Sequence, residues 1–248
     1  MILVDMSQIM MASIMMQMHM SKKSEPDEEM VRHMILNSLR MYRTRFLSEF
    51  GEMVLCYDSR HYWRRDYFPE YKHSRRKSRG TDDKNWDIIF NCLNTIKEEI
   101  KSNMPYKSVE VYGAEADDVI ATLCSESSNE VMILSGDKDF IQLQKFPNVK
   151  QYSPITKKMI NGMNPDDYLK EHVLKGDTSD GVPNVLSPDN TFVDGIRQRP
   201  LSKKKIATMV EGDFPNDEVK RNYQRNKKLI DLTCSPDELR SEILDTYK

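Results

Sequence analysis

Short apolar runs that end beside an acidic residue recur along the chain. Met1–Asp5 is one such run, and Met53–Tyr57, followed by Asp58, is another. Apolar runs of this length, bounded by polar residues, are typical of strands that are buried on both faces of a parallel sheet. We expect further strands at Val109–Tyr112, Val131–Leu134 and Val149–Tyr152.

Between these runs, apolar residues recur at three- and four-residue steps, which predicts helices. The expected helices cover residues 9–20, 30–50, 86–100, 114–124, 164–174, 203–211, 216–230 and a last segment after 235, with a short helical turn at 140–143. Gly51 ends the second helix, Thr81 caps the third, and Ser235–Glu238 forms a capping box for the last. Strands that alternate with helices indicate an α/β fold with a mostly parallel central sheet and helices on both faces.

The last third of the chain has a different character. Expected helices follow one another there without strands between them, and Pro188–Pro200 is irregular. We therefore expect residues 1–160 to form an α/β core and residues 161–248 to form a helical subdomain.

Composition excludes several classes of protein. The 248 residues carry 37 Lys+Arg and 39 Asp+Glu, so a wholly basic nucleic-acid binder is excluded, although a protein with segregated charges is not. The four cysteines form no Cys-x-x-Cys pair, which leaves a zinc ribbon or a thioredoxin-type site unsupported. No apolar run approaches the roughly 20 residues that span a bilayer. We expect a soluble protein of a reducing compartment without membrane contact.

Acidic residues gather where the expected strands end. The carboxyl ends of parallel strands meet at one edge of such a sheet, where ligands bind. Like charges that crowd there repel, so they need cations, and carboxylate oxygens favour Mg²⁺ or Mn²⁺. No histidine is suitably placed, which is unfavourable for a zinc site. The acids are Asp5, Asp58, Glu115, Asp117, Asp118, Asp137, Asp139, Asp177 and Asp180.

Each of these acids, taken singly, also fits a structural role. Asp117 and Asp118 suit a helix N-terminus, whereas Asp137, Asp139 and the later pair suit turns. Their recurrence at the ends of strands favours a metal site.

Residues 60–80 break the apolar pattern. They hold eight Lys or Arg, two acids and five aromatic residues. Basic side chains neutralise phosphates and aromatic rings stack on unpaired bases, so this segment is a candidate single-strand-binding arch with Arg64, Tyr71 and Arg76 among its contacts. The alternative is a solvated run of charge. A second basic stretch, which is either a candidate contact to duplex backbone or a solvated helix face, consists of Arg197, Arg199, Lys203, Lys204 and Lys205.

Six segments occur in the order of the motifs of the 5′ nuclease superfamily, which includes flap endonucleases and the 5′ nuclease domain of bacterial DNA polymerase I. Two further segments, 31–38 and 147–151, resemble in particular the ribonuclease H branch of T-even bacteriophages. The resemblance covers residues 1–185 well and the remainder loosely. The six segments are Ile2–Asp5, Tyr62–Asp66, Tyr71–Lys72, Ala114–Asp118, Ser135–Phe140 and Gly176–Asp180.

The resemblance implies a PIN-like nuclease core, a helical arch at about residues 60–80 and a helix–two-turn–helix-like element in the C-terminal subdomain. It implies two Mg²⁺ ions, for which Mn²⁺ can substitute. Lys72, together with Arg65 or Arg75, is implied to reach the scissile phosphate. The implied ligands are Asp5, Asp58, Glu115, Asp117 and Asp137 for one metal, and Asp139, Asp177 and Asp180 for the other.

The resemblance further implies the activity. We expect a metal-dependent 5′→3′ exonuclease and flap endonuclease, with ribonuclease H activity, that removes RNA primers from lagging-strand fragments during phage DNA replication. Its substrates would be RNA–DNA hybrids and branched or flapped duplex DNA. We expect a monomer in the cytoplasm of the host, with a reduced C-terminal contact to the phage single-stranded DNA-binding protein.

Two alternatives stay open from the sequence. One is a non-catalytic protein that binds branched DNA and keeps the acids for cation-dependent structure. The other is a PIN-like ribonuclease that acts on single-stranded RNA. Such ribonucleases usually lack an arch and a third acidic turn, so residues 60–80 and the Asp177/Asp180 pair disfavour the second alternative.

Overall fold

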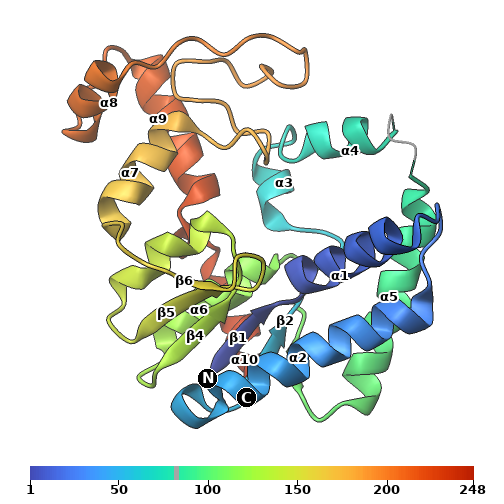
Figure 1. Ribbon diagram of the computed structural model, residues 1–248. Coiled ribbons are helices and arrows are strands. Elements are labelled where there is room, and N and C mark those ends of the chain that lie inside the picture. The colour runs from blue at the N-terminus through green and yellow to red at the C-terminus, as the bar shows by residue number, and fades with distance from the viewer. Residues whose placement is uncertain (81–83) are drawn as a thin grey trace.

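The computed structural model describes residues 1–80 and 84–248, and a six-stranded sheet lies at its centre (Figure 1). The strand order is β3-β2-β1-β4-β5-β6, and every neighbouring pair is parallel except β5 with β6. In register, Ile2 lies between Met53 on one side and Met132 on the other. The strands are β1 Ile2–Asp5, β2 Met53–Cys56, β3 Lys107–Val109, β4 Val131–Leu134, β5 Val149–Ser153 and β6 Lys158–Ile160.

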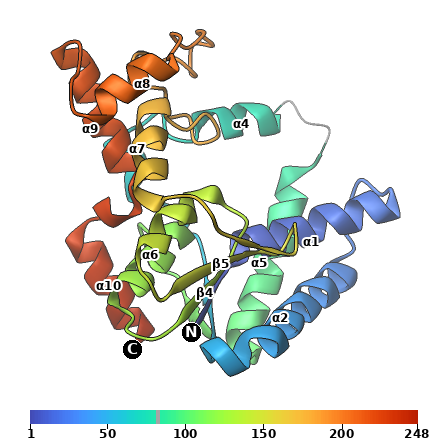
Figure 2. The same cartoon turned by 60° about the vertical axis from the view of Figure 1, so that its left-hand side comes forward.

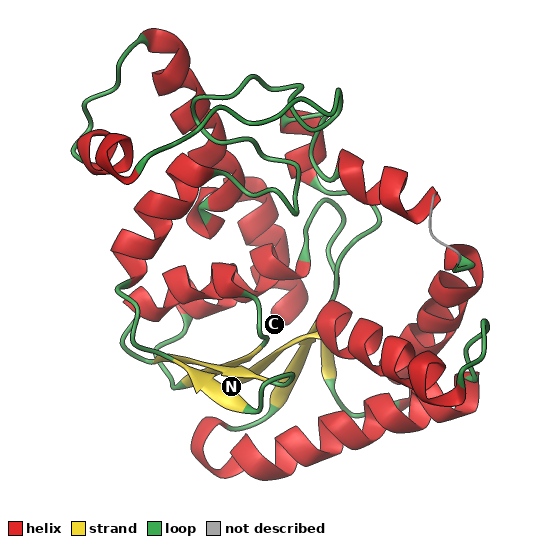
Figure 3. Cartoon of the chain, turned by 45° about the horizontal axis from the view of Figure 1, so that its top comes forward, coloured by secondary structure: helices red, strands yellow, loops and turns green. Residues whose placement is uncertain are grey.

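Helices cover both faces of the sheet and also form an upper region (Figures 1 and 3). No helix in the described part of the chain is both long and apolar enough to cross a membrane. The α-helices are α1 Met6–Ser21, α2 Glu28–Phe50, α3 Trp63–Tyr67, α4 His73–Gly80, α5 Trp86–Asn103, α6 Ala116–Glu126, α7 Pro165–Lys175, α8 Lys203–Val210, α9 Asp217–Ile230 and α10 Asp237–Tyr247, and the 3₁₀ helices are η1 Lys138–Lys145 and η2 Leu232–Cys234.

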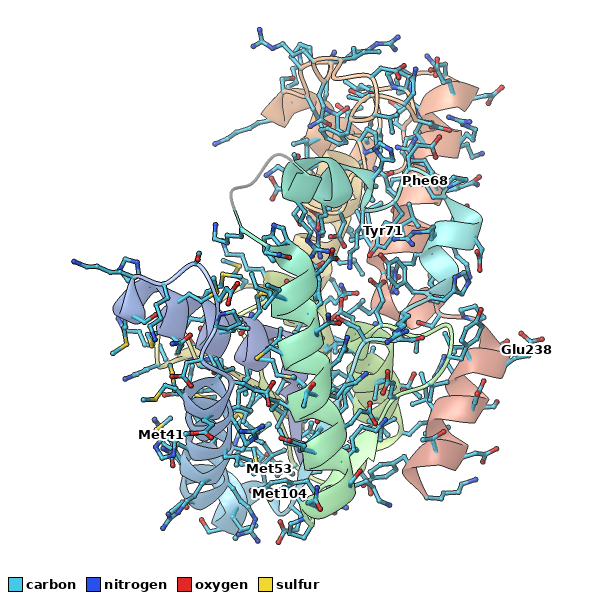
Figure 4. All side chains as sticks on the ribbon, turned by 90° about the vertical axis from the view of Figure 1, so that its right-hand side faces the viewer. Met41, Met53, Phe68, Tyr71, Met104 and Glu238 are labelled. Carbon is cyan, nitrogen blue, oxygen red and sulfur yellow. The ribbon has the colours of Figure 1, made fainter. Side chains whose placement is uncertain are left out.

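Alternation along β1 divides the apolar residues between two cores. Val4 packs on one face with α1, α2 and α5, in the cluster that also holds Met53 and Met104 (Figure 4). Leu3 points to the other face, where α6, η1 and α10 contribute. Both faces of the strand are therefore buried, which explains why β1 is a continuous apolar run. The expected α/β class with a mostly parallel sheet is confirmed.

The structure differs from several of the expected elements. The antiparallel edge strand β6 was not predicted, and β3 ends at Val109, where the expected strand began. Thr81 lies outside the described residues, and α5 begins after Asn85, whose side chain accepts a hydrogen bond from the Ile88 amide at 3.3 Å. The expected capping box before α10 is wrong, because the Ser235 hydroxyl accepts no hydrogen bond from an amide of the helix; it donates to Asp118 instead.

The helices after residue 160 lie in two different regions of the molecule. Helices α7, α8 and α9 lie together with α4 above the sheet, as Figure 2 shows. The last helix, α10, returns to the core, where Leu239 and Ile243 pack in the cluster that contains α6. A division of the chain at residue 160 therefore separates α10 from the helix on which it packs.

Candidate active site

Asp5 is the last residue of β1 and lies close to Asp117, which lines an acidic cleft together with Asp139, Asp177 and Asp180. Its side chain is 7% exposed, and it accepts hydrogen bonds from the Gln8 amide at 3.1 Å and from the Ser135 hydroxyl at 2.8 Å. Burial, together with the neighbouring charge of Asp58, raises the pKa of Asp5 from 3.8 to about 6. The carboxylate is thus held in place by two donors but has no cation beside it among the described residues.

Asp58 follows β2 and joins two neighbouring elements of the site. One carboxylate oxygen accepts the Ser7 hydroxyl at 2.6 Å, and the other accepts the Ala116 amide at 2.7 Å. The second donor is the first residue of α6, and a helix N-terminus favours a negative charge. Asp58 therefore fixes the start of α6 against the end of β2.

Asp117 and Asp137 each lie close to other acids, and the opposing effect of Lys72 on Asp117 is smaller than that of those acids. Burial and the nearby charges of Asp137 and Glu115 raise the pKa of Asp117 well above its ordinary value. The pKa of Asp137 is raised as well, by loss of solvation in the cleft and by Asp139. Within residues 1–80 and 84–248, no side-chain hydrogen bond or ion pair engages Asp117. Groups in this condition are stabilised when a cation binds between them.

A buried arginine organises the next part of the site. Arg64, from α3, is 1% exposed, and its Nη1 donates to Glu115 at 2.9 Å and to Asp118 at 2.8 Å, while its Nε donates to the Leu229 carbonyl. Although burial opposes ionisation, Arg64 lowers the pKa of Asp118. The carboxylate of Asp118 also accepts the Glu115 amide and so completes a capping box at the start of α6. The carboxylate oxygens of Asp118 thus accept hydrogen bonds from other groups of the protein.

The arch supplies two further cations, which meet the acids directly. Lys72 Nζ lies 2.5 Å from Glu115 Oε1 and 3.5 Å from Asp180 Oδ2, and Arg75 forms an ion pair with the other oxygen of Asp180. Burial alone lowers the pKa of Lys72, but the charges of Glu115 and Asp180 outweigh it and raise that pKa above its ordinary value. Lys72 therefore keeps its positive charge at every physiological pH.

A tight turn between α7 and the following loop brings the third acidic pair to the cleft. Asp177 accepts the Ser179 amide at 2.7 Å and the Asp180 amide at 3.2 Å, and the Asp180 carbonyl accepts the Lys72 amide at 2.7 Å. Gly176 has φ 69°, and a Cβ there would lie 2.3 Å from the Val182 carbonyl. Only glycine fits both the conformation and the space. The turn thus locks the base of the arch to α7.

One histidine enters the site, contrary to the sequence-based expectation. His172 Nε2, on the last turn of α7, lies 3.0 Å from Asp139 Oδ1 and 3.9 Å from Asp177 Oδ2. Burial disfavours the imidazolium, but contact with Asp139 and Asp177 outweighs burial and raises the pKa of His172. The three ligand atoms lie within 4.8 Å of one another. The periodicity of α7 held no signal that would have placed this residue among acids from other elements.

The acids predicted to bind metal all lie at this cleft, in two overlapping groups. Asp5, Asp58, Asp117 and Asp137 form the deeper group, because the charges of Asp58 and Asp137 raise the pKa of Asp5, and those of Asp137 and Asp5 raise the pKa of Asp117. Asp139 and Asp177 form the outer group with His172. Glu115 and Asp180 lie between the arch cations and these acids. The donor set is dominated by carboxylate oxygens, so it fits hard divalent cations such as Mg²⁺ and Mn²⁺.

The structure corrects part of the predicted nucleic-acid contacts. Arg64 and Tyr71 were expected to touch nucleic acid, but both are buried, and the Tyr71 hydroxyl donates to Glu115 at 3.1 Å and to Asp180 at 2.7 Å. Arg65 projects from a different side of α3 and donates to the Tyr62 hydroxyl, so Arg75 rather than Arg65 lies beside the acids. Tyr71 and Phe68, which Figure 4 labels, belong to a buried apolar cluster with Val173 of α7 and Leu229 of α9.

The remaining predicted contacts lie elsewhere. The side chain of Arg76 lies outside the described part of the structure. Lys203, Lys204 and Lys205 are exposed in the first turn of α8, away from the acids. Positive charges are unfavourable at a helix N-terminus, because that end of the helix dipole is itself positive. This lysine cluster therefore does not stabilise α8.

Comparison with known proteins agrees with this geometry. The family described as 5′-3′ exonuclease, N-terminal resolvase-like domain, matches residues 1–173. Ribonuclease H of Enterobacteria phage T4 is 34% identical over 99% of this chain and 85% of its own length. Flap endonuclease Xni of Shewanella sp. (strain MR-4) is 29% identical, over 50% of this chain and 48% of its own length.

Solved structures share the fold across the whole chain. A bacteriophage T5 flap endonuclease, solved in a complex with DNA and metal ions, has a TM-score of 0.67 at 15% identity, and the match covers 99% of this chain and 98% of that one. The acidic edge, the arch and the family match agree with one another. This chain therefore belongs to the 5′-3′ exonuclease family.

Proposed function

We propose that this protein is a Mg²⁺-dependent 5′→3′ exonuclease and flap endonuclease with ribonuclease H activity, which removes RNA primers during phage DNA replication. The observation that carries the proposal is that acids from the ends of β1 and β4 lie close to Asp117 and Glu115 at the start of α6, and that Glu115 and Asp180 pair with two cations of the arch. The similarity to a ribonuclease H and to flap endonucleases supports the same reaction.

Two cations would be held by the two groups of acids. The deeper ion would lie among Asp5, Asp58, Glu115, Asp117 and Asp137, and the outer ion around Asp139, Asp177 and Asp180. When bound, such ions supply Lewis-acid chemistry that activates water and offsets charge on the leaving oxygen. Mn²⁺ would substitute for Mg²⁺ because both take oxygen ligands in octahedral sites.

The protein itself contributes fixed positive charge at the mouth of the cleft. Lys72 and Arg75 are held over Glu115 and Asp180 by the turn that contains Gly176. When a phosphodiester enters the cleft, Lys72 and Arg75 would exchange their contacts with these acids for contacts with the phosphate. Because the pKa of Lys72 is raised, it would act as a permanent electrostatic stabiliser of the phosphorane rather than as a proton donor.

The lysine cluster of α8 would bind the duplex backbone at a position distant from the cleft. Lys203, Lys204 and Lys205 are exposed and lie in the same upper region as the arch helix α4 (Figure 2). Phosphate contacts of this kind position a nucleic acid without reading its sequence.

The monomeric state, the cytoplasmic location and a contact with a single-stranded DNA-binding protein stay predictions.

The decisive experiment digests two labelled substrates side by side. A duplex with a 5′-labelled RNA primer and a duplex with a 5′-labelled DNA flap are incubated with Mg²⁺, and the product lengths are resolved on a gel. We expect short products from both, and none when the metal is chelated. A gel shift without shortening would identify a binder of branched DNA, and cleavage restricted to single-stranded RNA would identify a PIN-like ribonuclease.

A further inference from the structure

His172 is the one nitrogen ligand among the carboxylates that the described residues bring together as a possible metal site. Its Nε2 lies 3.0 Å from one oxygen of Asp139 and 3.9 Å from one oxygen of Asp177. One ligand atom from each of the three residues lies within 4.8 Å of the others. Three donors at this separation can share one ion, since metal–ligand bonds are about 2 Å long.

The ring nitrogen faces two acidic side chains. Nε2 is buried and lies within ion-pair distance of Asp139, but it lacks the geometry of a hydrogen bond with any group in the described chain. The imidazole is 17% exposed, so solvent is not its main partner. A buried polar atom that faces two carboxylates and makes no hydrogen bond is a candidate ligand.

A stacked tyrosine and the end of α7 fix the orientation of the imidazole. Tyr168, one turn earlier on α7, stacks on it with ring centroids 5.5 Å apart and an angle of 25° between the planes. The helix continues to Gly176, whose amide donates to the His172 carbonyl at 2.9 Å. The backbone and the ring are thus held in one position, which is the condition for a strong ligand.

We propose that His172 is a direct ligand of the outer cation, together with Asp139 and Asp177, and that it shifts this site towards borderline transition-metal ions. The inference rests on the proposed two-cation nuclease. Imidazole suits Co²⁺ and Zn²⁺ better than Mg²⁺, whereas the carboxylates of the deeper group suit Mg²⁺. The two sites of the same cleft would therefore differ in their choice of metal.

Pulsed electron paramagnetic resonance of the protein, stripped of metal and then loaded with Mn²⁺, tests the ligation directly. A coordinated imidazole gives a nitrogen coupling to the Mn²⁺ electron spin. We expect this coupling in the unaltered protein and in His33→Gln, which changes an exposed histidine of α2. We expect its loss in His172→Gln and in His172→Asn. Absence of the coupling from the unaltered protein, a result that needs no variant, would overturn the proposal, and so would its persistence in both His172 variants.

Calorimetric titration tests the preference between metals. We expect the affinity of the outer site for Co²⁺ to fall about tenfold or more in His172→Gln, and its affinity for Mg²⁺ to change much less. Equal losses for the two ions would contradict the shift in preference. Both readouts are independent of cleavage, so a protein that binds Mn²⁺ through His172 and cuts no nucleic acid would contradict only the proposed function.

Discussion

Replacing Asp5 with asparagine should stabilise the metal-free protein at neutral pH. Asn keeps the shape of the side chain, and its oxygen can still accept the Gln8 amide at the start of α1, while its amide group can donate to the Ser135 hydroxyl. What the substitution removes is a buried negative charge with no cation beside it. The change therefore isolates the cost of holding an ionised carboxylate at this position.

The size of the effect follows from the pKa of Asp5. Because that pKa is about 6 in the folded protein and 3.8 ordinarily, the folded state keeps the proton after the unfolded chain has lost it. Stability therefore falls as pH rises from about 4 to about 6, and the full loss is about 3 kcal/mol. We expect the free energy of unfolding of Asp5→Asn to match that of the unaltered protein near pH 4 and to exceed it by up to ~3 kcal/mol at pH 7.

Urea denaturation in the presence of a chelator, repeated from pH 4 to pH 7.5, measures this difference. Asp245→Asn, which changes an exposed side chain of α10, is the matched control and should change the free energy of unfolding by less than ~0.5 kcal/mol throughout. Added Mg²⁺ should stabilise the unaltered protein more than Asp5→Asn, since the variant lacks a ligand. An Asp5→Asn protein that is less stable at pH 7 without metal, or a difference independent of pH, would refute the reasoning.

Three further substitutions probe the surroundings of the acids. Lys72→Ala should lower the single-turnover cleavage rate by about 10²-fold or more while substrate binding in a gel shift changes little, and equal losses in both would contradict its catalytic role. Arg64→Ala should cost about 3–5 kcal/mol in urea denaturation because it leaves Glu115 and Asp118 short of a buried partner, whereas Arg240→Ala, which breaks an exposed pair, should cost less than ~1 kcal/mol. Gly176→Ala should lower stability by at least ~2 kcal/mol, measured by thermal unfolding, and an unchanged midpoint would show that the turn can relax.

The apolar runs were enough to predict the sheet and the edge at which the acids meet. β1, β2 and β4 are buried on both faces, so each is a continuous apolar segment, and each ends beside an acid by the same rule of parallel topology. The edge strand β6 escaped because its residues, Lys158–Ile160, are largely exposed and carry no apolar run. Its place depends on pairing with β5, which a local pattern does not encode.

The roles of individual basic and aromatic residues could not be predicted from their composition. Arg64 and Arg65 are neighbours with the same charge, yet one is buried against Glu115 and the other lies on Tyr62. Which of the two enters the protein depends on the rotation of α3, and that rotation depends on contacts with α9 far along the chain. Tyr71 was likewise expected to stack on bases, because the residues near it in the sequence give no sign that its hydroxyl bonds Glu115 and Asp180.

His172 shows the same limit for a metal ligand. It stands in a helix of ordinary pattern, and the acids it meets come from the start of η1 and from the turn after α7. Spacing along the chain separates it from Asp139 by more than thirty residues. Only the packing of α7 on η1 brings the imidazole to the cleft.

We propose that cations held by the acids at the ends of the strands do the cutting, and Asp137→Asn tests this most directly. Single-turnover cleavage of a 5′-labelled flap substrate in Mg²⁺ is measured for this variant and for Asp245→Asn, with substrate binding measured in parallel. We predict that Asp137→Asn binds the flap nearly as well as the control and loses about a thousandfold or more in cleavage rate, the equivalent of several kcal/mol of Lewis-acid stabilisation. A cleavage rate equal to that of the control would contradict the account.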